Sequence, residues 1–435
     1  MGSPDSTRAT PSYLVGVQLA VNAVSDACLL TDGPNCSVAK SDFIHGNHDL
    51  RSTLFDTSGR HRTMQTSVDP ADVVVGREPS VSAKLGEMAS ADSCGVALLT
   101  SLPFCAMTAV DYGRVVRQVA AGTGKPVLNI PSASLSADWL DGYSDTLAAL
   151  AGAVQTRRSR PRRGKVAIVG YLMDRAEQDH AANVAELRRL LEGLGLELVS
   201  VWPGNVPYAQ LARACEAGTI LSLPYGRQAA RIIAEKTGAD LLELGLPFGL
   251  GRTEDWVRAV ATAFGRERKA EGLISRELDP VLKNLEWVVP QVLLHRRAAI
   301  CADPYLFEGL ARLFEDLGCE LVAGAVMGRG GLSDSGFRAA HPGAPAPLQD
   351  PSAGAWRREL AAAGNVDFIV QNSRMETPGA PRAAVVELGF PSYAHHALTE
   401  EPFLGFGGCL HFVERVVNAI LTADRYGSGR SSSNP

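Results

Sequence analysis

The chain has 435 residues, of which 46% are hydrophobic and 20% charged, a balance typical of globular proteins. This length exceeds what one hydrophobic core ordinarily serves, so two or three domains are expected. The net charge of −5 argues against a nucleic-acid binder, which needs a basic face. No apolar run reaches the roughly 20 residues that span a bilayer, and no secretory signal opens the sequence, so we expect a cytoplasmic protein without membrane contact.

A strand–helix–strand rhythm occurs three times along the chain. Each copy begins with a short apolar run, continues with apolar residues spaced for one helix face, and ends with a second apolar run. Such units predict parallel strands joined by right-handed crossovers. The expected elements, in chain order, are strand 95–100, helix 110–120, strand 126–130, strand 164–170, helix 184–194, strand 196–201, strand 297–302, helix 306–317 and strand 320–325.

The three copies predict an α/β protein with three Rossmann-like domains, whose parallel sheets surround a central cleft. We place the domains at residues 1–156, 164–285 and 290–425, followed by a disordered tail at 426–435. The basic stretch 157–163 and the charged stretch 266–284 are the candidate boundaries. The Gly-, Pro- and Ala-rich segment 328–352 is expected to be a long surface loop.

The turn around Gly33 and Pro34 carries the most informative chemistry. An apolar run enters this turn, and Cys36 stands at its exit. A thiol on a tight loop beyond a strand is well placed to meet a ligand or a neighbouring subunit. The alternative is a buried cysteine that acts as a small hydrophobic residue.

Motifs for nucleotides, zinc and hydrolases are missing from the sequence. There is no GxGxxG, no GxxxxGK[ST], no GxSxG and no Cys-x-x-Cys pair among the eight cysteines. The chain is therefore not expected to bind ATP or NAD through those motifs. If its chemistry needs ATP, another protein must supply it.

These residues resemble the nitrogenase component 1 family, which includes the nitrogenase α and β chains, their cofactor-assembly scaffold, and the dark-operative protochlorophyllide and chlorophyllide reductases. Residues 32–36 are similar to the family motif His-Gly-Pro-x-Gly-Cys, one residue shorter, whose cysteine ligates a bridging iron–sulfur cluster. The resemblance covers nearly the whole chain. Further similar segments are Asp72–Gly76, Leu98–Leu102, Leu246–Thr253, Asp367–Ser373, Gly389–Pro391 and Gly405–Gly408.

Departures from the family pattern indicate a β-type subunit. Subunits of the α type supply three cysteines, but here none lies near Pro11, Ser101 replaces another, and only Cys36 remains. A four-iron cluster normally needs four protein ligands, mostly thiolates. The resemblance therefore implies a [4Fe–4S] cluster shared with a three-cysteine α-type sister subunit, in a heterodimer or heterotetramer. A homodimer is the alternative.

Other cysteines could replace the missing ligands. Cys105 follows the strand end near Ser101 and could act as a second metal ligand, so we count Cys36 and Cys105 as candidate metal ligands and Ser101, Gly33 and Pro34 as candidate cofactor-binding residues. Cys28 and Cys94 are further candidates, although Cys28 lies in an apolar run that favours the core. The remaining cysteines are expected to be structural: Cys215, Cys301, Cys319 and Cys409.

Two histidine pairs are candidate proton donors. His45 and His48 follow Cys36 closely, in a region that in the family lies near the cluster and the partner surface. His395 and His396 follow the Gly-Phe-Pro segment, where the family lines its substrate cavity. Surface or loop residues without a chemical role are the plainer interpretation of both pairs.

The resemblance implies a subunit of a nitrogenase-like oxidoreductase that takes electrons from an ATP-dependent iron protein through the shared cluster and reduces a bound substrate. In this scheme the iron protein uses the ATP, and this chain does not. One alternative is a scaffold that assembles a metal cofactor without turnover. Another is a cluster-free small-molecule-binding protein with the same α/β architecture. The identity of the substrate stays open.

Overall fold

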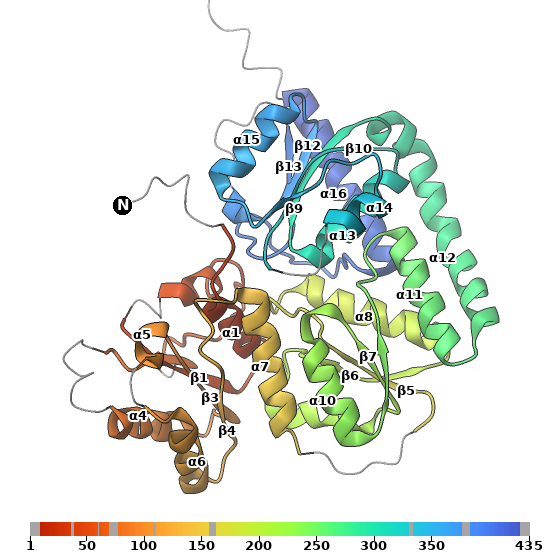
Figure 1. The fold of residues 1–435 in the computed structure, drawn as a ribbon. Coiled ribbons are helices and arrows are strands. Elements are labelled where there is room, and N and C mark those ends of the chain that lie inside the picture. Colours follow the sequence, from red (N-terminus) through yellow and green to blue (C-terminus); the bar gives the residue numbers. More distant parts are fainter. Residues whose placement is uncertain are drawn as a thin grey trace, which may run out of the picture. The chain divides into compact units, whose positions relative to one another are not determined.

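The computed structural model describes residues 9–35, 39–59, 61–68, 77–107, 110–155, 162–329, 334–375 and 383–426. Its named strands form three sheets, and every neighbouring pair of these strands is parallel (Figure 1). The chain divides into two compact units. The N-terminal unit comprises Pro11–Glu177 and Leu196–Leu244, and the C-terminal unit comprises Met1–Thr10, Gln178–Gly195 and Gly245–Pro435.

The first sheet of the N-terminal unit has the order β2-β1-β3-β4, formed by Thr63–Gln65, Ala27–Asp32, Val96–Ser101 and Val127–Asn129. Every residue of β1 and β3 is buried, because helices cover both faces. Alternate residues such as Cys28 and Leu30 pack with α4 (Glu78–Ser90) and α6 (Tyr112–Thr123). On the other face, α1 (Tyr13–Asn22) contacts β1 and α7 (Trp139–Ala153) contacts β4.

Two glycines allow α1 and α7 to pack closely. A Cβ added to Gly16 would lie 1.8 Å from the carbonyl oxygen of Trp139, and one added to Gly142 would lie 2.1 Å from the carbonyl oxygen of Tyr13. Both contacts are with backbone, which cannot move aside as a side chain can. These positions therefore require glycine.

The second sheet of the N-terminal unit has the order β6-β5-β7-β8, formed by Glu197–Trp202, Lys165–Val169, Thr219–Ser222 and Asp240–Glu243. Helix α10 (Arg227–Thr237) contacts both β7 and α7. The shorter elements of this unit are η2 (Lys40–Phe43), α5 (Pro103–Ala106), α9 (Tyr208–Leu211), η3 (Ala212–Glu216) and η4 (Pro224–Gly226).

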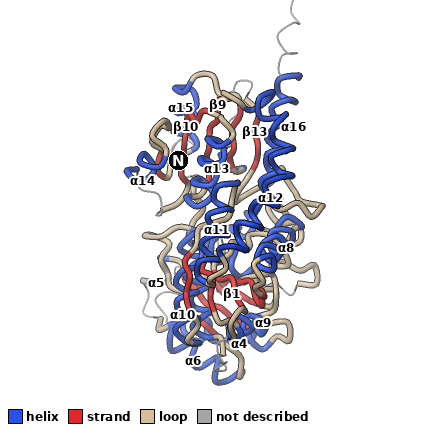
Figure 2. The backbone as a smooth tube through the Cα atoms, turned by 90° about the vertical axis from the view of Figure 1, so that its right-hand side faces the viewer, coloured by secondary structure: helices blue, strands red, loops and turns tan. Residues whose placement is uncertain are grey.

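The C-terminal unit holds the third sheet, in the order β11-β10-β9-β12-β13. These strands are Leu348–Gln349, Glu320–Val326, Arg297–Ala302, Phe368–Gln371 and Ala384–Glu387. Trp356 of α15 packs on one face, and Phe314 of α13 meets the Phe368 ring edge-on on the other, with 5.0 Å between ring centroids. Helix α16 runs alongside β13 (Figure 2). The other elements are α8 (Gln178–Gly193), α11 (Leu250–Ala263), α12 (Glu267–Val288), η5 (Val289–Leu293), α13 (Pro304–Asp316), α14 (Asp334–Ala340), α15 (Ala353–Ala363), η6 (Ser373–Met375) and α16 (Gly405–Tyr426).

The expected strand–helix–strand units are present, and the α/β class with three parallel sheets is confirmed. The charged stretch 266–284, a candidate boundary, forms most of α12, whose buried residues recur at helical spacing beneath a charged face. One expectation about a connecting segment was wrong. The segment 328–352 contains α14 and β11 instead of one continuous loop. The basic stretch 157–163 lies mostly outside the described residues, as do residues 427–435, and Tyr426 ends α16.

Among the described residues, no helix combines the length and the apolar character needed to cross a lipid bilayer.

Candidate functional site

The turn that precedes Cys36 begins at the carboxyl end of β1. Asp32 is the last residue of this strand and is fully buried, and Gly33 and Pro34 follow it. The amide of Gly33 donates a hydrogen bond of 3.1 Å to Thr66 Oγ1. Cys36 itself lies outside the described residues. The structure therefore describes Gly33 and Pro34 at the start of the turn, but not the Cys36 thiol.

Arg77, at the start of α4, donates a hydrogen bond to each of the two carboxylate oxygens of Asp32. Its Nη2 donates to Asp32 Oδ1 at 2.7 Å and its Nη1 to Asp32 Oδ2 at 3.0 Å. Thr66 Oγ1 donates to Asp32 Oδ1 at 2.6 Å. Burial works against the charge on Arg77, but its hydrogen bonds to Asp32 and the negative charge of that carboxylate outweigh burial, so the pKa of Arg77 is raised. A two-bond arginine–carboxylate pair of this kind fixes both side chains in orientation.

Tyr112 and Cys105 complete this buried cluster. The Tyr112 hydroxyl donates to Asp32 Oδ2 at 2.6 Å, and burial together with that bond raises the pKa of Tyr112. The Cys105 thiol is fully buried and lies 3.5 Å from Arg77 Nη1. Burial raises the pKa of Cys105, and the negative charge of Asp32 adds to this effect. Cys105 is therefore held mainly as a thiol, although metals bind the thiolate.

Ser101 lies at the same sheet edge as the turn. It is the last residue of β3 and pairs in register with Asp32. Its carbonyl oxygen accepts a bond of 2.7 Å from Ser132 Oγ, and its side chain shares a hydrogen bond with Tyr112. The residues predicted from the sequence thus lie at or just beyond the ends of two adjacent strands: Gly33, Pro34, Ser101 and Cys105.

His45 and His48 lie in the loop after η2, where they have different surroundings. His48 is 1% exposed, and its Nε2 lies 3.3 Å from Asp174 Oδ2. His45 is only partly buried, and its ring meets Phe55 edge-on with 5.2 Å between centroids. These contacts place both histidines in the N-terminal unit, beside Asp174 and Phe55.

All of the described cysteines are buried. Cys28 and Cys94 share a hydrogen bond beneath α4 and α6, and this bond, together with burial, raises the pKa of Cys94. Burial likewise raises the pKa of Cys319 and of Cys409 to about 12. Within the described part of the chain, no three His, Cys, Asp or Glu residues come together in a way that could hold a metal ion. These residues alone do not fit a complete iron–sulfur site.

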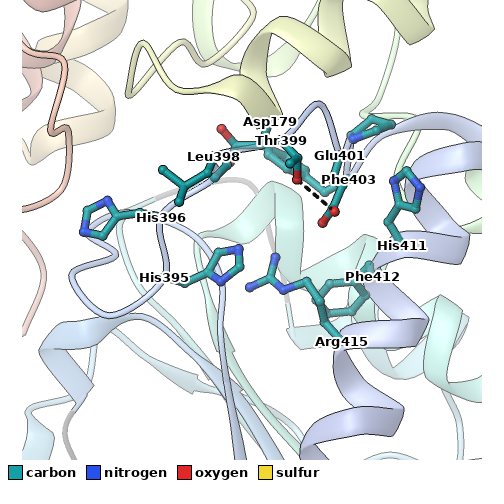
Figure 3. Close-up of a pocket in the computed structure, with 12 residues that line it drawn as sticks. Asp179, His395, His396, Leu398, Thr399, Glu401, Phe403, His411, Phe412 and Arg415 are labelled. Carbon is teal, nitrogen blue, oxygen red and sulfur yellow. Dashed lines mark hydrogen bonds between the residues drawn. The ribbon is translucent and has the colours of Figure 1, made fainter.

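His395 and His396 belong to the C-terminal unit, where they line a pocket of about 170 Å³. Figure 3 shows them beside the start of α8 and the side of α16. The loop that carries them is tied to Glu387, which accepts bonds from Ser392 Oγ and from the Ala394 amide at 2.9 Å. Burial alone would raise the pKa of Glu387, but these bonds lower it.

Several residues of these two sites were missed from the sequence. Thr66, Arg77 and Tyr112 have no motif that ties them to Asp32, since 34 to 80 residues separate them along the chain. His411 and Arg415 of the pocket are spaced four residues apart and therefore share one face of α16, which is the signal that could have linked them. Nothing local pointed to Asp179.

Three sheets of parallel strands, with helices against their faces, define an α/β protein of the Rossmann-like type. Residues 12–421 match the model of the nitrogenase component 1 type oxidoreductases. The chain belongs to this family. A solved structure of "Nitrogenase Cp1 at pH 6.5" has the same fold, with a TM-score of 0.80 over 97% of this chain and 94% of that chain at 16% identity.

Curated relatives are distant. The nitrogenase molybdenum-iron protein beta chain of Frankia alni is 24% identical over 56% of this chain and 50% of its own length. The nitrogenase iron-iron protein alpha chain of Rhodobacter capsulatus is 26% identical over 53% of this chain and 43% of its own length. The matches span about half the length of these relatives, at 50% and 43%.

Proposed function

We propose that the chain is one subunit of a nitrogenase-like oxidoreductase, which takes electrons from an ATP-dependent iron protein through a shared iron–sulfur cluster and reduces a bound substrate. The observation that supports the proposal is the Asp32–Gly33–Pro34 turn at the end of β1, because the sequence that continues it to Cys36 resembles the family motif with the cluster-ligating cysteine. Asp32 is held by Arg77, Thr66 and Tyr112, so the turn starts from a rigid base.

Cys36 is the metal ligand that this chain would contribute. The described residues hold no ligand set of their own, and a cluster needs about four protein ligands, so a sister subunit must supply the others. When bound, such a cluster accepts and passes single electrons. Cys105 is the weaker candidate ligand, because its thiol is buried and its pKa raised. Gly33, Pro34 and Ser101 would border the cluster.

The surface near this sheet edge suits a sister subunit. Phe104, Met107 and Leu135 are 45%, 79% and 80% exposed, and they follow the carboxyl ends of β3 and β4. Large apolar side chains that are this exposed favour protein contact. We propose a heterodimer or heterotetramer with a three-cysteine sister chain, and a homodimer would be the other outcome of a mass measurement.

We assign electron delivery to the partner iron protein and proton delivery to histidines of this chain. The sequence has no phosphate-binding loop motif, so we assign ATP hydrolysis to the iron protein. We propose His45, His48, His395 and His396 as proton donors. His395 and His396 line the pocket of the C-terminal unit and suit this role better than His48, which is buried against Asp174.

Anaerobic co-purification with the sister subunit tests the proposal. The complex should contain iron and sulfide, and its cluster should become reduced when the iron protein and ATP are added. Omission of ATP, or a non-hydrolysable analogue in its place, should leave the cluster oxidised. A complex with iron that the iron protein never reduces would refute the electron-transfer role.

A second candidate function is small-molecule binding without a cluster. It is favoured by the lack of a metal-ligand group among the described residues and by the pocket of about 170 Å³. A colourless, iron-free complex that is otherwise folded and assembled would support this candidate over the first.

A further inference from the structure

Helix α12 has an exposed face that carries large apolar side chains. The helix is 22 residues long and lies at the margin of the C-terminal unit (Figure 1). Helices α11 and α16 contact it, and its buried residues recur at helical spacing. Away from these buried residues, Trp287 is 63% exposed and Leu282 is 51% exposed. Apolar side chains of this size, exposed on a regular helix, favour contact with another protein.

Trp287 belongs to a short row of exposed residues along this face. Pro280, Lys283 and Trp287 are separated by three and four residues, so they lie on the same side of the helix. Glu286 is also exposed and lies beside Lys283, three residues further along the chain. We call Pro280, Lys283, Glu286 and Trp287 the α12 row. It combines two apolar residues with one residue of each charge.

The two charges of the α12 row take no part in ion pairs within the chain. In the part of the chain that the structure describes, neither Lys283 nor Glu286 has an ion-pair partner, whereas Glu271 of the same helix pairs with Arg258. Opposite charges at this spacing complement the same two charges in reverse order. A second α12 that runs antiparallel presents this reverse order, because a two-fold axis between the helices reverses the chain direction.

The same antiparallel arrangement also matches the apolar residues. With the two-fold axis midway between positions 283 and 286, Lys283 of each copy faces Glu286 of the other. Trp287 then comes within about 3 Å, along the helix axis, of the level of Pro280 in the second copy. Both residues lie on the same side of the helix, so the indole can cover the proline ring. In a parallel pair, by contrast, Lys283 would face Lys283 and Glu286 would face Glu286.

We propose that two copies of this chain associate through antiparallel α12 helices. Trp287 of each copy packs on Pro280 of the other, and two Lys283–Glu286 ion pairs form between the copies. The contact involves the C-terminal unit, whereas Phe104 and Met107, assigned to the sister subunit, belong to the N-terminal unit. Together with the proposed sister subunit, this contact gives a heterotetramer, but the contact itself depends on neither Cys36 nor a cluster.

A charge-reversal experiment with mixed variants tests the proposal. Sedimentation velocity of the full-length chain, alone and with its sister subunit, gives the number of copies per particle. Lys283→Glu makes both charged positions of the contact acidic, and Glu286→Lys makes both basic. Each variant alone should therefore raise the dissociation constant of the pair at least about tenfold. An equimolar mixture of the two variants should restore pairing, because acidic positions then face basic ones.

Two controls accompany the charge variants. Arg268→Glu changes the charge by the same amount on the same helix, but so far toward its N-terminal end that the second α12 does not reach it, and it should pair like wild type. Trp287→Ala should weaken pairing at least about tenfold, as truncation of a central aromatic residue in an interface does. Leu421→Ala, at a side chain 48% exposed on α16, should leave pairing unchanged.

Three results would overturn the proposal. The first is a single copy of this chain per particle for wild type throughout the micromolar range. The second is pairing of both charge variants as tight as that of wild type. The third is a mixture of the variants that pairs no better than either alone, which would place the contact on another surface. None of these results concerns the iron content of the complex, so failure here is distinct from failure of the proposed redox function.

Discussion

The buried pair of Asp32 and Arg77 should be strongly coupled in the folded protein. Arg77→Met keeps much of the side-chain volume but leaves the Asp32 carboxylate with Thr66 and Tyr112 as its side-chain donors among the described residues. Asp32→Asn leaves the Arg77 charge buried at 6% exposure without its carboxylate. Removal of one partner from a buried ion pair costs roughly 3–5 kcal/mol. We therefore expect each single substitution to destabilise the first sheet by about that amount.

The double variant Asp32→Asn with Arg77→Met measures the coupling. It holds no unpaired charge, so its cost should fall short of the sum of the single costs by about 2–3 kcal/mol. Hydrogen exchange of the backbone amides in β1 and β3 reports this local stability, because both strands are buried throughout. Additive single effects, or a single Arg77→Met effect below about 0.5 kcal/mol, would refute the role assigned to the pair.

Three further predictions concern other parts of the chain. Hydrogen bonds to Glu387 hold its pKa below the ordinary 4.5 despite burial. The stabilising effect of the ionised Glu387 should therefore be complete above pH 4.5 and fade as the pH falls through the lower pKa of the folded protein. A stability difference between wild type and Glu387→Gln that persists undiminished far below the folded pKa would contradict this prediction. Gly142→Ala should lower the free energy of urea unfolding by about 3 kcal/mol or more, because its Cβ would meet the Tyr13 carbonyl oxygen at 2.1 Å. Gly152→Ala on the same helix has open space around the added Cβ and should cost nothing. Equal effects of the two substitutions would refute the close contact between the helices. Met107→Asp, at a side chain 79% exposed, should reduce co-purification with the sister subunit without lowering the melting temperature, and unchanged co-purification would remove Met107 from the interface.

Local sequence patterns predicted much of the fold. The strand 297–302 coincides with β9, and the strands expected at 164–170 and 320–325 match β5 and β10 within one residue at each end. These elements have continuous apolar runs bounded by glycine or polar residues, which is the strongest local signal for a buried parallel strand. The charged face of α12 concealed its helical spacing, and the Gly- and Pro-rich composition of 328–352 concealed α14 and β11.

The candidate sites were predictable only in part. Gly33, Ser101 and Cys105 could be grouped, because the carboxyl ends of neighbouring parallel strands meet at one sheet edge. The partners Arg77 and Tyr112 could not, because tertiary packing rather than local spacing brings them to Asp32. In the pocket, His395 is a candidate because of its position after the Gly-Phe-Pro segment, whereas no local pattern points to Asp179.

The central claim is that Cys36 ligates a cluster shared with a second polypeptide. Iron and sulfide content of the complex, measured for Cys36→Ala and for Cys105→Ala against wild type, tests it most directly, with the buried Cys215→Ala as the control for a cysteine of the core. The account predicts that Cys36→Ala loses most of the cluster iron while the sister subunit stays bound, and that Cys215→Ala keeps it. Full iron content in the Cys36→Ala complex would contradict the account.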